Sequence, residues 1–109
     1  MPRFMITGTY SAAAAKGMVD TPSDREAAAR KIVEATGGQL ECWYATTGAS
    51  DFVMIGTIAN LNDLMAGVMA GASSGTFGHM ETQQLFSGEE FTQIQKRAGE
   101  LRSSYMSAM

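Results

Sequence analysis

The sequence predicts an α+β domain of the ferredoxin-like type, a four-stranded antiparallel sheet with helices on one side and a further helix at the C-terminus. Three observations predict it. The chain has 109 residues, enough for one domain. Its apolar residues alternate in some segments and recur at helical spacing in others. The segments follow the order β-α-β-β-α-β plus a last helix, which in a chain of this length is that of two split βαβ units.

The first third of the chain predicts a strand, a loop and a helix. Residues 4–10 alternate as a strand does, and the small residues over 11–20 predict a loop. Thr21-Pro22 predicts a helix start, because Thr can cap and Pro suits the first helical position. An apolar stripe continues this helix to about residue 36, where Gly37-Gly38 ends it.

The middle of the chain predicts a hairpin of two strands, over residues 39–46 and 51–58. Strict alternation along the first of them places Leu40, Cys42 and Tyr44 on one face and Glu41, Trp43 and Ala45 on the other. The second strand is apolar almost throughout, which indicates a central strand covered on both faces.

The remainder predicts a helix, a strand and a last helix. Asn60 caps the first of these helices, which ends near Ser73, and residues 76–86 predict the fourth strand. Ser87 begins a capping box for the last helix. The apolar positions of that helix, expected to face the core, are Phe91, Ile94, Ala98, Leu101 and Tyr105. We expect a single domain over residues 1–102 and a frayed tail over 103–109.

The predicted helices cover one face of the sheet and leave the other uncovered. Because that second face also carries apolar side chains, a monomer would expose it to water. We therefore expect a homodimer or a larger homo-oligomer with sheets packed face to face.

Charge and composition exclude several classes of function. Eight basic and eleven acidic residues give a formal charge of −3, which argues against nucleic-acid binding. One cysteine and one histidine are too few for a metal cluster within a chain, so we expect no metal. No apolar run is long enough to cross a membrane, and polar Thr7 to Thr9 interrupt the apolar start as a signal peptide would not. The expected location is the cytoplasm.

Lys and Arg are absent between Ile32 and Gln95, which includes three of the four predicted strands and one helix. A pocket formed there would lack cations unless Arg3, Lys16 or a neighbouring chain reached into it. The sequence therefore favours a neutral or weakly polar ligand.

His79 is the one side chain whose ordinary pKa lies near neutrality, and Glu81 follows on the same strand face. The functional interpretation makes His79 a general base or a ligand donor, with Glu81 beside it at a bound molecule. The structural interpretation makes His79 a partly exposed residue near a sheet edge or an oligomer contact.

The other candidate residues each have two interpretations. Asp51 either ties down the preceding turn with a bond from its side chain to the backbone or acts in acid–base chemistry. Lys16 supplies a cation to a bound anion or is solvated. Tyr10 and Tyr44 line either a pocket or an oligomer interface. We expect Cys42 to be an inert core residue.

Several segments, taken together in their order, resemble the GYD domain family of small bacterial proteins. They include Lys16-Gly17 before Asp20-Thr21-Pro22, the run from Tyr44 to Val53, and Phe86-Ser87-Gly88-Glu89-Glu90-Phe91, within roughly residues 3–95. The signature Gly and Asp are present as Gly48 and Asp51, but Ser50 replaces the signature Tyr. The resemblance implies a dimeric α/β-barrel fold and brings no settled activity.

Two function classes remain open. The first is a homo-oligomeric barrel that binds a small organic molecule between sheet and helices, with His79, Tyr10 and Tyr44 lining the site. Relatives with this barrel include cofactor-independent monooxygenases and isomerases, so such chemistry without a cofactor is the catalytic option. The second is a non-enzymatic assembly or accessory protein. Haem binding through His79 is a third possibility.

Overall fold

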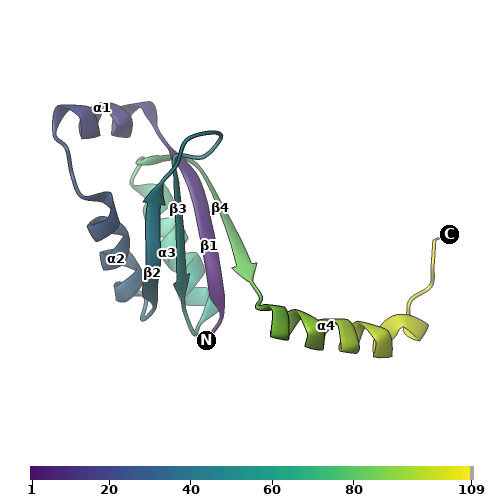
Figure 1. Cartoon of the computed structure of the whole chain (residues 1–109). Helices are drawn as coiled ribbons and strands as arrows, with labels where there is room; N and C mark the ends of the chain where they lie inside the picture. The colour runs from purple at the N-terminus through teal and green to yellow at the C-terminus, as the bar shows by residue number, and fades with distance from the viewer. Residues whose placement is uncertain (109) are drawn as a thin grey trace.

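The computed structural model describes residues 1–108 and contains one four-stranded sheet with four α-helices (Figure 1). Along the chain its elements are β1 (Arg3–Tyr10), α1 (Ala12–Asp20), α2 (Arg25–Ala35), β2 (Gln39–Ala45), β3 (Phe52–Thr57), α3 (Leu61–Ser73), β4 (Phe77–Leu85) and α4 (Gly88–Leu101). A short 3₁₀ turn, Arg102–Ser104, follows α4.

The strands lie in the order β2-β3-β1-β4, and every neighbouring pair is antiparallel. The central strand β1 pairs with β3 through Phe4 opposite Gly56 and with β4 through Phe4 opposite Gln84. This order confirms the ferredoxin-like α+β fold, because each split βαβ unit leaves room for one strand between its own two.

The core lies on the face of the sheet that α2 and α3 cover, which we call the helix-covered face. It is built from eight buried apolar residues: Phe4, Ile6, Val33, Leu40, Phe52, Met54, Ile58 and Leu64. Alternate positions of β1 and β3 supply half of them, as the period of a half-buried strand requires. The opposite, open face has none of the helices of residues 1–108 against it and carries intermediate and exposed residues.

A β-bulge in β2 corrects the predicted faces of that strand. The pairing with β3 shifts between Leu40 and Cys42, so Glu41 is an extra residue in the ladder. Leu40 and Trp43 consequently share the helix-covered face, whereas strict alternation had separated them. Cys42 and Tyr44 lie on the open face, and Cys42 is therefore half-buried rather than a core residue.

Residues 12–20 form a helix and not the predicted loop. Its alanines favour the helical state, and the Ser11 hydroxyl caps it by accepting the Ala14 N–H at 3.1 Å. Thr21 ends α1, since its N–H donates to the Gly17 carbonyl at 2.8 Å. The cap of α2 is consequently Asp24, which accepts the Ala27 N–H at 3.0 Å, and the Thr21-Pro22 start was wrong.

Helix α4 projects away from the sheet, and no residue of it is buried (Figure 1). Its capping box is present as predicted, with the Ser87 hydroxyl accepting the Glu90 N–H at 3.0 Å and Glu90 accepting the Ser87 N–H at 2.9 Å. The expectation that its apolar stripe faces the core was wrong: Phe91 is 56% exposed and Leu101 is 47% exposed. A connection of two residues after β4 leads this helix away from the sheet, so its apolar stripe stays exposed among the described residues 1–108.

Candidate functional site

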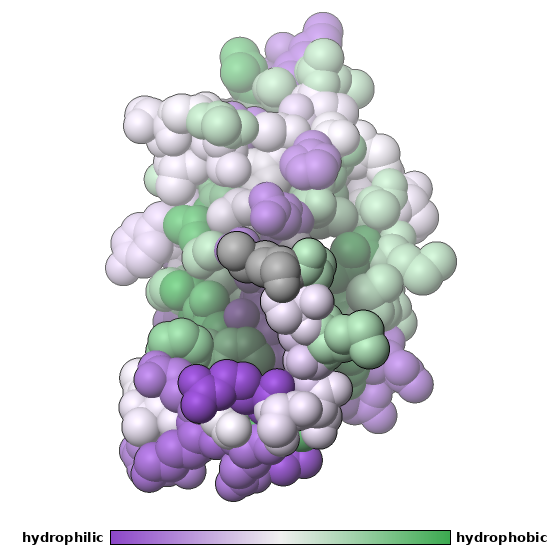
Figure 2. All heavy atoms as spheres, turned by 90° about the vertical axis from the view of Figure 1, so that its right-hand side faces the viewer, coloured by the Kyte–Doolittle hydropathy of each residue, from purple (hydrophilic) through white to green (hydrophobic). Residues whose placement is uncertain are grey.

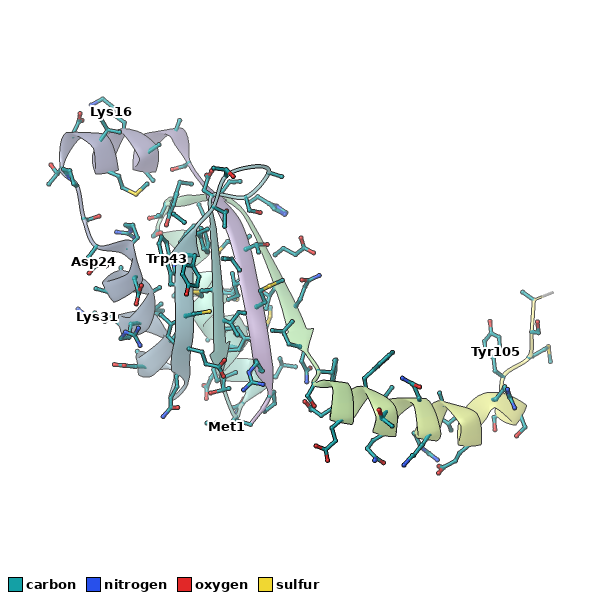
Figure 3. The ribbon with its side chains drawn as sticks, in the orientation of Figure 1. Met1, Lys16, Asp24, Lys31, Trp43 and Tyr105 are labelled. Carbon is teal, nitrogen blue, oxygen red and sulfur yellow. The ribbon has the colours of Figure 1, made fainter. Side chains whose placement is uncertain are left out.

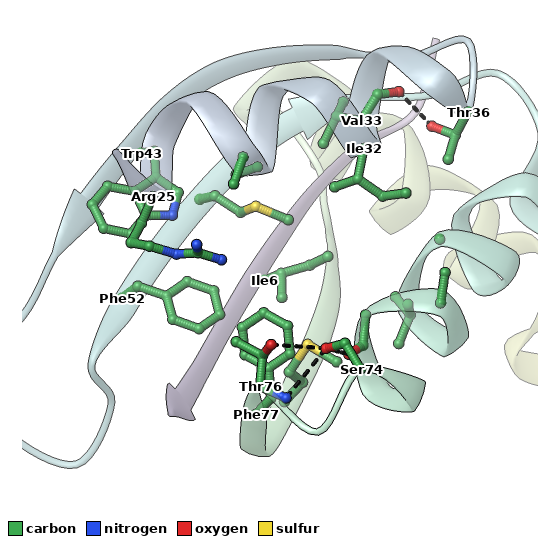
Figure 4. Close-up of a pocket in the computed structure, with 18 of the residues that line it drawn as sticks. Ile6, Arg25, Ile32, Val33, Thr36, Trp43, Phe52, Ser74, Thr76 and Phe77 are labelled. Carbon is green, nitrogen blue, oxygen red and sulfur yellow. Dashed lines mark hydrogen bonds between the residues drawn. The ribbon is translucent and has the colours of Figure 1, made fainter. Parts of the chain in front are cut away.

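A cavity of about 320 Å³ lies between the helix-covered face and helices α2 and α3 (Figure 4). All four strands contribute side chains to its walls. Small residues on the two helices, among them Ala28, Ala29 and Ala70, leave the space open. Gly67 and Gly71 have the same effect on α3, because a Cβ at Gly67 would come within 3.1 Å of Thr36, and one at Gly71 within 3.3 Å of the Phe77 ring.

Four aromatic rings form one end of the cavity, one from each strand. Phe52 is at their centre, with ring centroids 5.4 Å from Tyr10, 5.6 Å from Phe77 and 6.3 Å from Trp43. Tyr10 and Phe77, which pair across β1 and β4, stack at 5.7 Å. Register brings the rings together, because Tyr10, Trp43 and Phe52 occupy positions on the same face near corresponding strand ends.

Gly8 makes room for this aromatic end. It lies opposite Phe52 on β3 and opposite Met80 on β4. A Cβ at Gly8 would stand 2.6 Å from the His79 carbonyl oxygen and 3.0 Å from the Phe52 ring. Only a residue without a side chain therefore lets the Phe52 ring lie over β1.

Arg25 brings the one positively charged side chain into the cavity wall. Figure 4 shows it beside Trp43, with its guanidinium group directed into the cavity. Its Nη1 donates a long hydrogen bond of 3.4 Å to the Ser23 hydroxyl, while its Nε is buried and has no hydrogen-bond partner among residues 1–108. No ion pair found among residues 1–108 includes Arg25.

Tyr10 brings a phenol to the same end of the cavity. Burial raises the pKa of Tyr10 above its ordinary value; the nearby Arg25 acts in the opposite direction, and Asp51 adds to the increase. The phenol therefore keeps its proton at neutral pH and can donate a hydrogen bond. The backbone N–H of Tyr10 donates to Asp51 Oδ2 at 2.9 Å.

Asp51 fastens the turn before β3 to the end of β1, in accord with the structural interpretation of this residue. Besides the Tyr10 bond, its own N–H donates to the Gly8 carbonyl at 2.7 Å, and its carbonyl accepts the Thr46 N–H at 2.8 Å. Asp51 thereby holds Tyr10 in register without lining the cavity itself.

The structure does not bring the other predicted residues to the cavity. His79 and Glu81 pair with Thr9 and Thr7 at positions of the open face, and both are exposed. Tyr44, opposite Val53, lies on that face too. The sheet therefore separates these three side chains from Tyr10, and the expected grouping of His79, Tyr10 and Tyr44 in one site was wrong.

Lys16 lies on α1, which has no buried residue and sits beyond the end of the sheet (Figure 3). It forms an ion pair with Asp20 one helical turn later. Its position fits the interpretation as a solvated lysine.

Sequence reasoning missed Arg25, Phe52 and Phe77 as residues of the cavity. The signal for Arg25 was the apolar stripe of α2, since Ala28, Ala29 and Ile32 line the cavity at three, four and seven residues after Arg25. Extending that stripe back by one turn would have placed Arg25 on the same face. Arg25 also corrects the inference that the pocket lacks cations, because it precedes the segment without Lys or Arg.

Two features are absent from the described part of the chain. Over residues 1–108, no three His, Cys, Asp or Glu side chains are grouped so that they could hold a metal ion. Within the same residues, no helix has the length and apolar character needed to span a membrane.

Comparisons with known proteins agree with the fold and the sequence pattern. The solved structure described as "crystal structure of FFRP-DM1" is similar, with a TM-score of 0.53 and 13% sequence identity over 79% of this chain and 100% of the other. At that identity the likeness concerns the fold alone. No curated protein matches the chain. Residues 4–95 match the GYD domain. The chain therefore belongs to the GYD domain family.

Proposed function

We propose that this GYD-domain protein binds a small organic molecule in the cavity between its sheet and helices α2 and α3. The observation that carries the proposal is the cavity itself. Its volume of about 320 Å³ falls at the lower end of the range of small-molecule sites. Its walls are aromatic and aliphatic, with few polar groups, of which the Arg25 guanidinium and the Tyr10 hydroxyl lie at one end. Such a combination is typical of ligand sites.

The test uses the single tryptophan as a local reporter. Trp43 lines the cavity, so an occupant changes its fluorescence. Native mass spectrometry of the purified full chain would reveal a retained molecule by its added mass. Val68→Phe, on a half-buried cavity residue, should displace the occupant and lower binding at least tenfold. Met69→Phe, one residue further on and 67% exposed, should leave binding unchanged. Equal binding by both variants would refute the cavity as the site.

Catalysis without a cofactor, as an oxygenase or isomerase, remains a prediction and depends on an acid–base group at the ligand. Tyr10 and Arg25 are the titratable residues among those that line the cavity. If turnover of a bound molecule is found, Tyr10→Phe should reduce it and His79→Ala should not. The reverse result would move the reaction to the open face of the sheet.

A homo-oligomer is the second proposal, and the shape of the chain supports it. A globular monomer of this mass is expected to expose about 5,800 Å², whereas this chain exposes 7701 Å². Its radius of gyration is 17.5 Å, against about 13 Å for a compact domain of this length. The extra surface includes the apolar stripe of α4. Figure 2, which faces the α4 side, shows hydrophobic surface gathered in a hollow above a hydrophilic lower edge.

The oligomer proposal is tested by the mass of the particle in solution. Light scattering should give at least two chains. Ile94→Glu, which puts a charge on the apolar stripe of α4, should reduce the mass towards one chain. Gln93→Glu adds the same charge on the opposite side of the helix and should leave the mass unchanged. A wild-type mass of one chain at micromolar concentration would refute the proposal. The same two variants test the assembly or accessory interpretation, because loss of assembly without loss of ligand binding would separate the two functions.

A further inference from the structure

We propose that the molecule bound in the cavity carries a carboxylate on an apolar, preferably aromatic, body, and that Arg25 binds this carboxylate. The inference rests on the proposed function, since it names the ligand class of the same cavity. It also replaces the neutral or weakly polar ligand that the sequence favoured.

The first argument is the unpartnered Nε of Arg25. A guanidinium group stays charged at any pH the protein meets, and a buried donor without an acceptor destabilises the folded protein. Arg side chains usually avoid this cost by extending their charged end into water. In this chain the guanidinium group instead lies at the cavity, with its Nε out of contact with solvent (Figure 4). An acceptor on a ligand would satisfy it.

The second argument is the charge balance around the cavity. No acidic side chain lines it, so Arg25 gives the wall a charge of +1. Asp24 and Glu26 flank Arg25 in the chain, and Asp51 binds Tyr10; their carboxylates are already engaged, with the Ala27 N–H, the Arg30 guanidinium group and the Tyr10 N–H respectively. Among residues 1–108, none of the three forms an ion pair with Arg25. An anionic group would therefore be attracted at this end of the cavity, and a cationic ligand would be repelled.

The third argument is the geometry of the donors. A guanidinium group binds a carboxylate through two parallel N–H bonds, which fix its plane as well as its position. The Tyr10 hydroxyl lies near Arg25 and, because burial raises its pKa, it remains a neutral donor beside the guanidinium group. The rest of the wall at this end consists of Trp43, Phe52 and Phe77, which suit a flat apolar body attached to the carboxylate.

The test compares two probes of the same shape and different charge, phenylacetate and phenylacetamide. Each is titrated into the full-length wild-type chain, with Trp43 fluorescence and calorimetry as readouts. Phenylacetate should bind about tenfold tighter or more, the preference that hydrogen bonds to a charged group provide. Arg25→Gln should bring the two affinities to within about twofold. Arg25→Lys, which keeps the charge without the planar pair of donors, should give an intermediate preference.

Lys31→Gln is the matched control, because it removes one positive charge from the same helix. Lys31 is exposed on the outer side of α2 (Figure 3) and does not line the cavity. It should leave the preference for phenylacetate unchanged. An equal loss in Lys31→Gln and Arg25→Gln would show a general effect of charge and would overturn the role of Arg25.

The outcomes separate this inference from the function on which it rests. If both probes bind wild-type protein with equal affinity, the cavity binds ligands and the carboxylate inference is wrong. If neither probe binds at millimolar concentration, both the proposed function and the inference fail. The comparison of the two probes in wild-type protein tests the carboxylate inference even if the Arg25→Gln variant does not fold. Cross-linking of α4 of a second copy into the cavity would also overturn the inference, since the occupant would then be protein.

Discussion

Replacing Phe52 by Ala tests whether the aromatic end of the cavity is a packed wall. The Phe52 side chain is 3% exposed and its ring touches those of Tyr10, Trp43 and Phe77. Truncation removes the transfer free energy of the ring and leaves an additional void beside the existing cavity. Such Phe→Ala changes in cores cost about 3–5 kcal/mol.

Two features of the structure determine where the expected loss of unfolding free energy falls within that range. The three ring contacts add stabilisation of about 0.5–1.5 kcal/mol per pair beyond the buried area. The adjoining cavity, however, lets the neighbouring rings relax towards the deleted ring, which lowers the cost. We therefore expect a loss of about 4 kcal/mol, a large part of the 5–15 kcal/mol that stabilises a typical domain. Phe52→Leu keeps most of the volume and should cost only about 1–2 kcal/mol.

The assay is urea unfolding followed by far-ultraviolet circular dichroism, with the slope of the transition compared between variants. Phe86→Ala, at a phenylalanine that is 52% exposed, deletes the same atoms and should cost less than about 1 kcal/mol. A cost below about 2 kcal/mol for Phe52→Ala, or equal costs for both variants, would refute the packing argument.

Three further predictions concern other parts of the structure. Gly8→Ala should lower the free energy of unfolding by more than about 2 kcal/mol, because its Cβ would meet the His79 carbonyl at 2.6 Å; Gly17→Ala, with open space around it, serves as the control in the same urea titration. The hydrogen bond from the Ser87 N–H lowers the pKa of Glu90. The stabilisation of α4 by the Glu90 carboxylate is therefore full above the ordinary glutamate pKa and is lost as the pH falls through the lowered value. Amide exchange of α4, compared between wild type and Glu90→Gln, would show this loss. Burial raises the pKa of Tyr10, so the contribution of this residue to the free energy of unfolding is full below the ordinary tyrosine pKa and declines as the pH rises through the raised value. The Tyr10→Phe variant should lack this decline when its alkaline unfolding is compared with that of wild type.

The strands and the helices α2, α3 and α4 could be predicted because the spacing of their apolar residues agrees with the residues that begin and end each element, apart from the start of α2. Asn60 and Ser87 cap helices where their side chains imply, and the order of elements is enough to give the sheet topology. Helix α1 was missed because small residues, four alanines and Gly17, make up most of it, as in a loop, and none of its residues is buried. Propensity and the Ser11 cap, rather than packing, make it helical.

The cavity could be predicted only in part, because it depends on contacts between segments far apart in the chain. Its place between sheet and helices follows from the fold, and Tyr10 follows from its strand position. Arg25 and Phe77 come together only when α2 crosses the sheet. The orientation of His79 depends on the pairing of β4 with β1, a register that the local sequence of β4 does not determine.

The bulge at Glu41 has a consequence for insertions and deletions in this protein. Deleting Glu41 would remove the extra residue and restore strict alternation in β2. Leu40 and Trp43 would then be two positions apart and would still share the helix-covered face. The same deletion would remove the ion pair of 2.9 Å between Arg3 and Glu41, which joins the central strand to the edge strand on the open face. At this point of the strand, the loss of one residue therefore preserves the two faces of β2, and its cost is the loss of that ion pair and of the local twist that a bulge adds.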